Sequence, residues 1–309
     1  MSLFLEFLVV LVNAIWLWLV AIYKALVPVS MQWTKDMSKD TVLVTGAGSG
    51  IGRLMSLKFA EMGCRLVIWD INEEGNLETA RQIEAKGSKV KAYTVDLSNK
   101  ESIYETAAKV KADVGNVDVL VNNAGIVTGR KFLDCPDGLV EKTMEVNTNA
   151  HFWTTKSFLP EMMERNHGHI VTIASSAGLF GVATLADYCA SKFGAVGFDE
   201  SIRSEMLKYR KTGVHTTVVC PFFIKTGMFE GAKSRFPWLL PLLEPEYAAD
   251  KIMDAVRTNQ PMLCAPRVLY LLYFLRGVFP STVADVLAEF IGISASMDDF
   301  VGRTKPKTA

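Results

Sequence analysis

Three features are scarce in this 309-residue sequence: surplus charge, paired cysteines and repeats. Lys plus Arg and Asp plus Glu both total 33, so the formal net charge is zero and no basic surplus argues for a nucleic-acid partner. The five cysteines are scattered, odd in number and without CxxC spacing, which argues against a disulfide framework and against a zinc site. With 50% hydrophobic residues and no low-complexity linker, we expect one large domain with appendages and no bound metal.

The N-terminal residues differ in kind from the rest. From Phe7 to Val27 the only polar side chains are Asn13 and Lys24, and this length spans a hydrocarbon layer of about 30 Å. A membrane anchor is predicted. A cleavable signal peptide is disfavoured because Glu6, rather than a basic residue, precedes the run. An interfacial or hairpin helix is left open by Asn13 and Pro28.

After Met37, short β-rich runs alternate with longer amphipathic stretches, which is typical of βαβ units and of a parallel sheet covered on both faces. The prediction is an α/β fold with a doubly wound, seven-stranded parallel sheet. The predicted strands are Thr41–Thr45, Arg65–Asp70, Lys89–Val95, Val117–Asn122, His169–Ser175, Val214–Cys220 and Met262–Ala265. The predicted helices are Ile51–Met62, Glu73–Lys86, Lys100–Val114, Asp137–Glu164, Asp187–Lys208 and Tyr247–Thr258.

Three segments follow from these patterns: an anchor over 1–33, the α/β domain over 38–265 and a hydrophobic C-terminal segment over 266–309. The irregular stretch Thr226–Pro245, rich in aromatic residues, leucine and proline, is predicted to be an apolar lid. The apolar runs after residue 266 are too short to span a bilayer. Contact with a membrane surface, packing on the lid and a dimer interface are the alternatives for them.

A glycine-rich turn lies between the first strand and the first helix of the domain. Gly46, Gly50 and Gly52 let the backbone approach a pyrophosphate, which the N–H groups of the helix start attract. We expect Gly46, Ser49, Gly50, Ile51 and Gly52 to bind a dinucleotide.

The second strand ends at Asp70, where a carboxylate binds the adenosine ribose hydroxyls and repels a 2′-phosphate, so NAD is predicted over NADP. Arg53 is the one residue that favours NADP, because a guanidinium can receive that phosphate.

The third and fourth strands end in further candidates. Asp96 and Leu97 follow the third strand, where a side-chain acceptor reaches an adenine amino group. Asn122–Gly125 follows the fourth, and its small residues Ala124 and Gly125, with Asn123, let the chain pass beneath a flat ligand. The bland alternative for Asp96 is a turn or helix-cap residue.

Tyr188 and Lys192 carry the strongest chemical signal. Their i,i+4 spacing places the phenol and the ammonium on one helical face. A phenol with a pKa of about 10 is a poor base at neutral pH unless a cation favours its phenolate, and Lys192 is the predicted cation. A Tyr-Lys pair at this spacing is common on solvent-exposed helices. Whether the pair is catalytic therefore depends on which other residues the fold places beside it.

Two further residues, Ser175 and Asn147, are predicted to lie beside this pair. Ser175 ends the fifth strand, thirteen residues before Tyr188, and its hydroxyl can hydrogen-bond a reacting oxygen. Ser176 competes for that role, but strand alternation favours Ser175. Asn147 lies within a long helix, where its amide can hold a water that relays protons from Lys192, or can be an ordinary surface amide.

Together these residues resemble the short-chain dehydrogenase/reductase family over roughly 38–265. The resemblance implies a Rossmann-type fold, a catalytic set of Asn147, Ser175, Tyr188 and Lys192, and substrate contacts from Ser175 and Tyr188. It also implies that Tyr188 and Lys192 contact the cofactor, together with Ile224 and Thr226 after the sixth strand. Where the family has Pro-Gly, this sequence has Pro221-Phe222.

Longer strings narrow the resemblance to the retinol dehydrogenase branch, with lipid-droplet 17β-hydroxysteroid dehydrogenases as near neighbours. They include Trp69–Asn72, Lys131–Pro136, Asn166–Ile170 and Pro221–Gly231. The resemblance implies NAD-dependent oxidation of a lipophilic alcohol, all-trans-retinol first and a steroid second. It implies a homodimer on the endoplasmic reticulum membrane or lipid droplet, with the catalytic domain facing the cytosol. A lipid-droplet scaffold with little turnover is the alternative of another class.

Overall fold

The computed structural model describes residues 3–302, so the ends of the predicted anchor and C-terminal segments, 1–2 and 303–309, lie outside the described residues. The chain divides into two compact units at Asp36–Met37. The first unit contains α1 (Leu3–Leu26), an apolar helix in which no residue is buried. Among the described residues it is the one helix long and apolar enough to cross a membrane.

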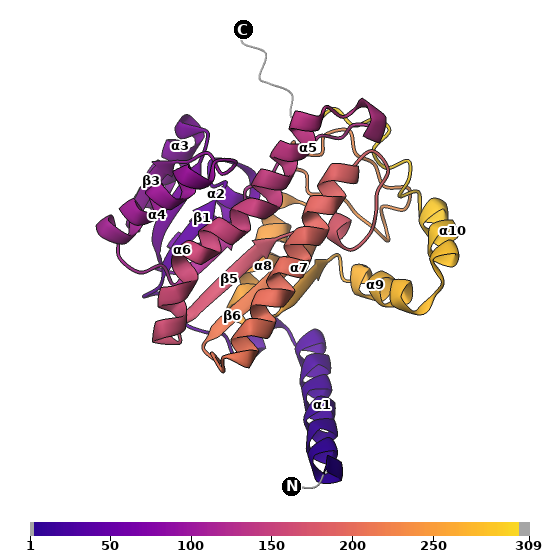
Figure 1. The fold of residues 1–309 in the computed structure, drawn as a ribbon, viewed down its shortest axis with the longest axis horizontal. Coiled ribbons are helices and arrows are strands. Elements are labelled where there is room, and N and C mark those ends of the chain that lie inside the picture. The colour runs from indigo at the N-terminus through magenta and orange to yellow at the C-terminus, as the bar shows by residue number, and fades with distance from the viewer. Residues whose placement is uncertain (1–2, 303–309) are drawn as a thin grey trace. The chain divides into compact units, whose positions relative to one another are not determined.

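The second unit is built on a seven-stranded parallel sheet in the order β3-β2-β1-β4-β5-β6-β7 (Figure 1). This confirms the predicted doubly wound fold. The strand order reverses direction between β1 and β4, and open sheets bind ligands at such a point, beyond the carboxyl ends of the strands. The strands are β1 (Thr41–Thr45), β2 (Arg65–Asp70), β3 (Val90–Thr94), β4 (Val119–Asn122), β5 (Gly168–Ile173), β6 (Val214–Pro221) and β7 (Met262–Ala265).

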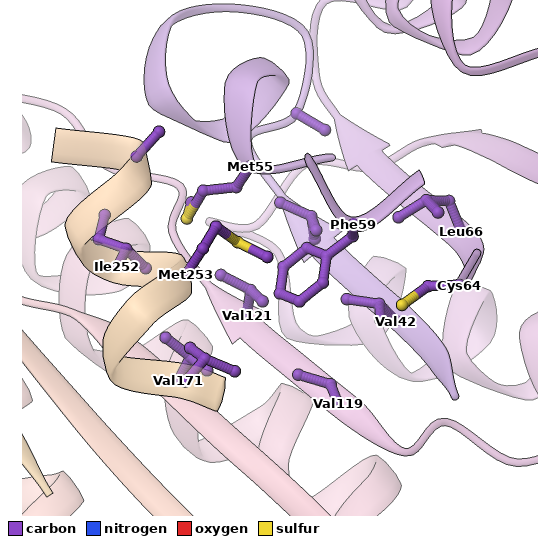
Figure 2. Close-up of a cluster of buried hydrophobic side chains, with 14 of the residues drawn as sticks. Val42, Met55, Phe59, Cys64, Leu66, Val119, Val121, Val171, Ile252 and Met253 are labelled. Carbon is purple, nitrogen blue, oxygen red and sulfur yellow. The ribbon is translucent and has the colours of Figure 1, made fainter. Parts of the chain in front are cut away.

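Helices cover both faces of the sheet because alternate strand residues point to opposite sides. Val42 and Val44 of β1 pack with one buried cluster, whereas Leu43 packs with the other. Figure 2 shows the first cluster, in which Phe59 and Met253 meet over the strands. The helices are α2 (Gly50–Glu61), α3 (Glu73–Ala85), α4 (Lys100–Asp113), α5 (Asp137–Met144), α6 (Ala150–Arg165), α7 (Ala186–Lys208), α8 (Pro245–Arg257), α9 (Val268–Val278) and α10 (Ser281–Ile291).

Two predicted elements differ from the structure. The single helix expected over Asp137–Glu164 is divided into α5 and α6 by a π-helical turn at Glu145–Asn149. The fifth strand ends at Ile173 rather than at Ser175. The physical reason is that the Ser175 Oγ accepts a hydrogen bond from the backbone N–H of Ala177, 3.1 Å away, and so starts a 3₁₀ turn.

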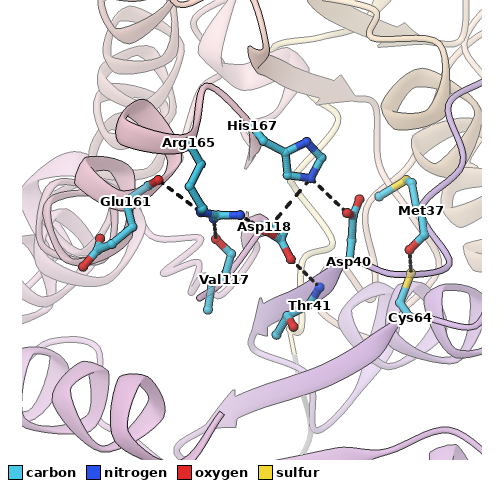
Figure 3. A network of polar contacts seen from close by, with 9 residues as sticks. All are labelled: Met37, Asp40, Thr41, Cys64, Val117, Asp118, Glu161, Arg165 and His167. Atoms are coloured by element: carbon cyan, nitrogen blue, oxygen red, sulfur yellow. Dashed lines mark hydrogen bonds and ion pairs between the residues drawn. The ribbon is translucent and has the colours of Figure 1, made fainter. Parts of the chain in front are cut away.

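A polar network joins the amino ends of β1 and β4 to the end of α6 (Figure 3). The Asp118 carboxylate accepts the backbone N–H of Thr41 at 2.8 Å and a guanidinium N–H of Arg165 at 2.6 Å. The His167 Nε2 lies 3.0 Å from an oxygen of Asp40. These contacts fix the strands at their amino ends. The side chains at the opposite, carboxyl ends therefore extend from strands whose positions are fixed.

The Asp199 carboxyl group is buried between β5 and β6, where it accepts hydrogen bonds from Thr172 at 2.9 Å and from Thr216 at 3.0 Å. Burial raises its pKa to about 7, because the ionised form loses hydration. The folded protein therefore holds this proton at pH values where the unfolded chain has released it. The contribution of Asp199 to the free energy of unfolding is therefore fully present below about pH 4. It is lost as the pH rises to about 7.

Asp199→Asn keeps the shape and the hydrogen-bonding capacity but removes the ionisation. We expect it to raise the free energy of unfolding by roughly 2–4 kcal/mol at pH 8 and to leave it nearly unchanged at pH 4. Urea unfolding at both pH values measures the effect, with exposed Glu205→Gln on the same helix as the control. A gain of the same size at both pH values would contradict the assignment.

Candidate active site

A cavity of about 360 Å³ lies at the carboxyl ends of the strands, where the strand order reverses. It brings together every predicted cofactor residue, although these residues are spread over more than half of the domain. Asn147 lies beneath the cavity rather than in its wall. The predicted residues that line the cavity are Gly46, Ser49, Gly50, Ile51, Gly52, Asp70, Asp96, Leu97, Asn123, Ala124, Gly125, Ser175, Tyr188, Lys192, Ile224 and Thr226.

The glycine-rich turn passes between β1 and α2 with backbone packed on backbone. A Cβ at Gly52 would lie 2.1 Å from the carbonyl oxygen of Gly46, so no larger residue fits there. Gly50 begins α2 with φ +57°, a conformation that L side chains rarely adopt. The first N–H groups of α2 are thereby placed at the cavity, where they can bind an anionic group such as a pyrophosphate.

Asp70 is held in place by the backbone on two sides. Its carboxylate accepts the N–H of Gly48 and the N–H of Asn72, both at 2.8 Å. Arg53 points elsewhere: its Nε donates to the Thr79 hydroxyl at 2.9 Å, and its Nη2 donates to the carbonyl of Gly75 at 3.1 Å. The guanidinium is thus engaged with protein groups, whereas Asp70 lines the cavity.

The residues after β3 and β4 take two different roles in the structure. The Asn123 side chain donates to the Thr45 carbonyl at 2.8 Å and so ties β4 to β1 under the cavity. Asp96 accepts two hydrogen bonds from Ser98, at 2.9 Å from the N–H and 2.7 Å from the hydroxyl. Asp96 is therefore a turn residue, the alternative set out above, and it lies in the cavity wall as well.

Tyr188, Lys192 and Ser175 form one buried cluster. The Lys192 Nζ donates to the Ile173 carbonyl at 2.8 Å and lies 5.7 Å from the centre of the Tyr188 ring. Ser175 lines the cavity together with Tyr188, whereas Ser176 begins the 3₁₀ turn that follows and is not among the lining residues. This placement favours Ser175 over Ser176.

The pKa values in this cluster are set mainly by burial. Burial raises the pKa of Tyr188, and the hydrogen bond from Ser175 lowers it by less. Burial also lowers the pKa of Lys192 to about 8. The i,i+4 spacing alone therefore does not give Tyr188 an acidic phenol, because burial of the side chain has the largest effect on its pKa.

Asn147 lies within the π-helical turn and is fully buried. Its oxygen accepts the Ile126 N–H at 2.8 Å, and its amide group donates to the Ile126 carbonyl at 2.9 Å and to the Ser191 hydroxyl at 3.0 Å. The surface-amide interpretation is wrong. Asn147 fixes the chain beside Gly125, where a Cβ would lie 3.3 Å from the Asn147 oxygen and 3.6 Å from the Lys192 Nζ.

Sequence reasoning missed two aromatic residues of the cavity wall, Phe222 and Phe223, which directly follow Pro221. Met228 and Phe229, which also line the cavity, lie within the predicted apolar lid Thr226–Pro245. The available signal was that Phe222 and Phe223 directly follow β6, a strand whose carboxyl end lies at the site. Phe300, which lies near the end of the described chain, packs in the same cluster as Phe229. It is so close to Gly129 that a Cβ there would lie 2.0 Å from the Phe300 ring. No sequence signal pointed to Phe300.

The fold and the site together define an oxidoreductase that acts on alcohols with a dinucleotide. Residues 40–235 match the family model described as short chain dehydrogenase. The chain therefore belongs to the short-chain dehydrogenase family. It is 53% identical to epidermal retinol dehydrogenase 2 of Homo sapiens over 88% of each chain. It is 43% identical to retinol dehydrogenase 10 of Xenopus tropicalis, over 100% of this chain and 97% of that one. The predicted resemblance to these two groups is confirmed.

Solved structures share the fold. A short chain dehydrogenase/reductase from Burkholderia phymatum in complex with NAD superposes with a TM-score of 0.71 at 23% identity, covering 89% of this chain and 100% of that one. A metagenomic short-chain oxidoreductase in complex with NADP gives 0.63 at 29% identity, covering 73% and 96%.

The burial of Lys192 leads to a test that needs no turnover. Lys192→Met keeps the aliphatic stem and removes a charge whose desolvation is unfavourable. We expect the free energy of unfolding at pH 7 to rise by about 1–2 kcal/mol, less than the full linkage value because the Ile173 carbonyl loses its donor. The gain should shrink above pH 8, where the native ammonium deprotonates.

Urea unfolding measures this change, and exposed Lys109→Met is the matched control, expected to stay within 0.5 kcal/mol, a typical limit for a surface change. A loss of stability in Lys192→Met at pH 7 would contradict the unfavourable burial of this ammonium.

Proposed function

We propose that this chain oxidises all-trans-retinol to all-trans-retinal with NAD+. The observation that carries the proposal is the buried Tyr188–Ser175–Lys192 cluster between a glycine-rich dinucleotide turn and an aromatic cavity wall. A polyene alcohol fits such a wall, and the close relative of 53% identity is named as a retinol dehydrogenase.

Within this proposal Tyr188 takes the hydroxyl proton of the alcohol and Ser175 hydrogen-bonds the same oxygen. Lys192 lies below the phenol and provides positive charge, while Asn147 holds the Ile126 backbone and Ser191 so that the proton path beside Lys192 keeps its shape. Bound NAD+ would receive the hydride and bring a second positive charge beside the phenol. Because burial raises the pKa of Tyr188, both charges are needed to favour its phenolate.

The proposed cofactor contacts follow the cavity wall. The turn Gly46–Gly52 would hold the pyrophosphate, Asp70 the adenosine ribose and the 96–97 pair the adenine. Ile224 and Thr226 would lie beside the nicotinamide. The engagement of Arg53 by Thr79 and Gly75 supports NAD over NADP, since that guanidinium is not directed at a 2′-phosphate.

The N-terminal helix α1 is long and apolar enough to cross a membrane, which supports membrane association of the chain. We propose the endoplasmic reticulum membrane and the lipid droplet as its locations, with the catalytic unit in the cytosol and a homodimer as its assembly. Lys24 near the end of the apolar run, and Lys35 and Lys39 after it, support the cytosolic side.

The catalytic proposal is tested with Tyr188→Phe in liposomes containing all-trans-retinol and NAD+. Loss of the proton acceptor is expected to lower kcat/KM by about 10²–10⁴-fold while the Kd for NAD+ stays within about threefold. NADH fluorescence measures turnover, and exposed Tyr104→Phe is the control, expected to keep full activity. Equal activity in Tyr188→Phe would reject the mechanism. An inactive wild-type chain that still reaches lipid droplets would favour the scaffold alternative.

Cofactor choice is tested with Asp70→Ser. Removing the carboxylate removes hydrogen bonds to the ribose and the repulsion of a 2′-phosphate, so we expect the Kd for NAD+ to rise about tenfold and that for NADP+ to fall. Equilibrium titration of both cofactors measures the change, with exposed Glu73→Gln from the adjacent helix as the control. A wild-type preference for NADP+ would contradict the role of Asp70.

The second candidate substrate is a 17β-hydroxysteroid, a lipophilic alcohol that suits the same wall. The two substrates differ in shape, because a steroid is rigid and broad whereas retinol is long and narrow. Comparing kcat/KM for estradiol and retinol, both delivered in the same liposomes, decides between them.

A further inference from the structure

The helix α10 is amphipathic, yet its apolar face is turned to the outside. Val283, Val286, Leu287 and Phe290 recur at the i, i+3, i+4, i+7 spacing of one helical face, and all four are exposed, Val286 by 67% and Phe290 by 59%. No residue of α10 is fully buried. A surface helix of a globular domain normally turns this face to the core.

The charged residues of α10 lie on the opposite side of the same helix. Asp285 and Glu289 are four residues apart, and by helical geometry they point away from the apolar stripe. Ala284 and Ala288 lie between the two faces and are partly buried. The helix is held in this rotation because Arg235 donates to the Phe290 carbonyl at 2.8 Å and its guanidinium lies 5.2 Å from the centre of the Phe290 ring.

Two neighbouring segments extend the exposed apolar surface. Along α9, Leu271, Phe274 and Val278 are exposed on one side, with Phe274 at 65%, while Leu269 is buried against the domain. Figure 1 shows α9 and α10, in yellow, as a pair that projects from the body of the second unit. In the lid, Trp238 is 80% exposed, and Phe236 joins it to α10 through ring contacts with Trp238 at 6.2 Å and with Phe290 at 5.5 Å.

The N-terminal helix indicates what covers this surface. The helix α1 is apolar along its length with no buried residue, and ten residues, 27–36, connect it to the second unit. Ten residues reach at most about 35 Å when fully extended. A membrane-embedded α1 would therefore tether Met37, where the second unit begins, within that distance of a lipid surface, so a lipid surface is the partner that we take for the exposed face.

We propose that α9, α10 and Trp238 form a lipid-docking surface, with the Leu271–Phe274–Val278 and Val283–Phe290 stripes inserted among the acyl chains at the interface and Asp285 and Glu289 directed to water. Interfacial helices bury an apolar face in this way to a depth of about 5–10 Å. The surface continues inward: Leu239, next to Trp238, packs in the same cluster as the cavity residue Phe222. If the proposed function holds, this continuity gives a membrane-dissolved alcohol an apolar path to the cavity.

The test places an environment-sensitive fluorophore on each face of α10 in the full-length chain. Val286→Cys and Asp285→Cys, each made with Cys135→Ser and labelled with a nitrobenzoxadiazole maleimide, are reconstituted in phosphatidylcholine liposomes. Cys135 is replaced because it is the partly exposed cysteine, whereas the other four are buried. Nitroxide-labelled phosphatidylcholine quenches a label in lipid, and aqueous iodide quenches a label in water.

We expect the label at position 286 to be quenched at least twofold more by nitroxide lipid than the label at 285, and iodide to give the reverse order. Iodide quenching of both labels alike would overturn the proposal. A label at 286 shielded from both quenchers would also overturn it, because protein, such as a second copy of this chain, would then cover the stripe. Neither readout involves turnover, so a failure of retinol oxidation is distinguishable from a failure of docking.

Discussion

The burial of the Lys192 ammonium is the constraint on which the site depends. A buried ammonium needs hydrogen-bond acceptors or a nearby anion to offset its lost hydration, and here it donates a hydrogen bond to the Ile173 carbonyl. The position of that carbonyl is fixed by the end of β5, and β5 in turn lies between β4 and β6. The position of the reacting phenol is thus determined by the central strands of the sheet rather than by a surface loop.

The helix α7 carries several other buried polar side chains besides Lys192. It carries Asp187, Tyr188, Ser191, Lys192 and Asp199, all of them buried, and Asp187 accepts hydrogen bonds from Thr128 at 2.8 Å. Besides its buried apolar residues, this helix therefore depends on satisfied hydrogen bonds with β5, β6 and the loop after β4. The opposite end of the sheet, braced by Asp118 and Arg165, shows the same dependence on polar contacts. Stability and site geometry therefore rest on the same class of interaction.

Much of the fold could be predicted because it depends on local patterns. Strand and helix periodicity located all seven strands to within two residues, and the glycine turn and Asp70 located one half of the cavity. The π-helical turn could not be predicted, since it depends on Asn147 reaching Ile126 and Ser191, which are distant in the sequence. The raised pKa of Tyr188 was missed for a similar reason, because spacing reveals a neighbouring charge but not the loss of hydration. The exposure of the apolar face of α10 could not be predicted either, because the spacing of apolar residues is the same whether that face is turned to solvent or to the core.

The contact of Phe300 with Gly129 has a consequence for the order in which the molecule is completed. The dinucleotide half is built from residues before about 125, whereas the wall near Phe229 is finished by a ring close to the end of the chain. Every residue that lines the cavity is therefore synthesised well before the ring that packs in the same cluster as Phe229. Premature termination shortly before residue 300 would keep all of the lining residues and would remove the aromatic ring that lies against Gly129.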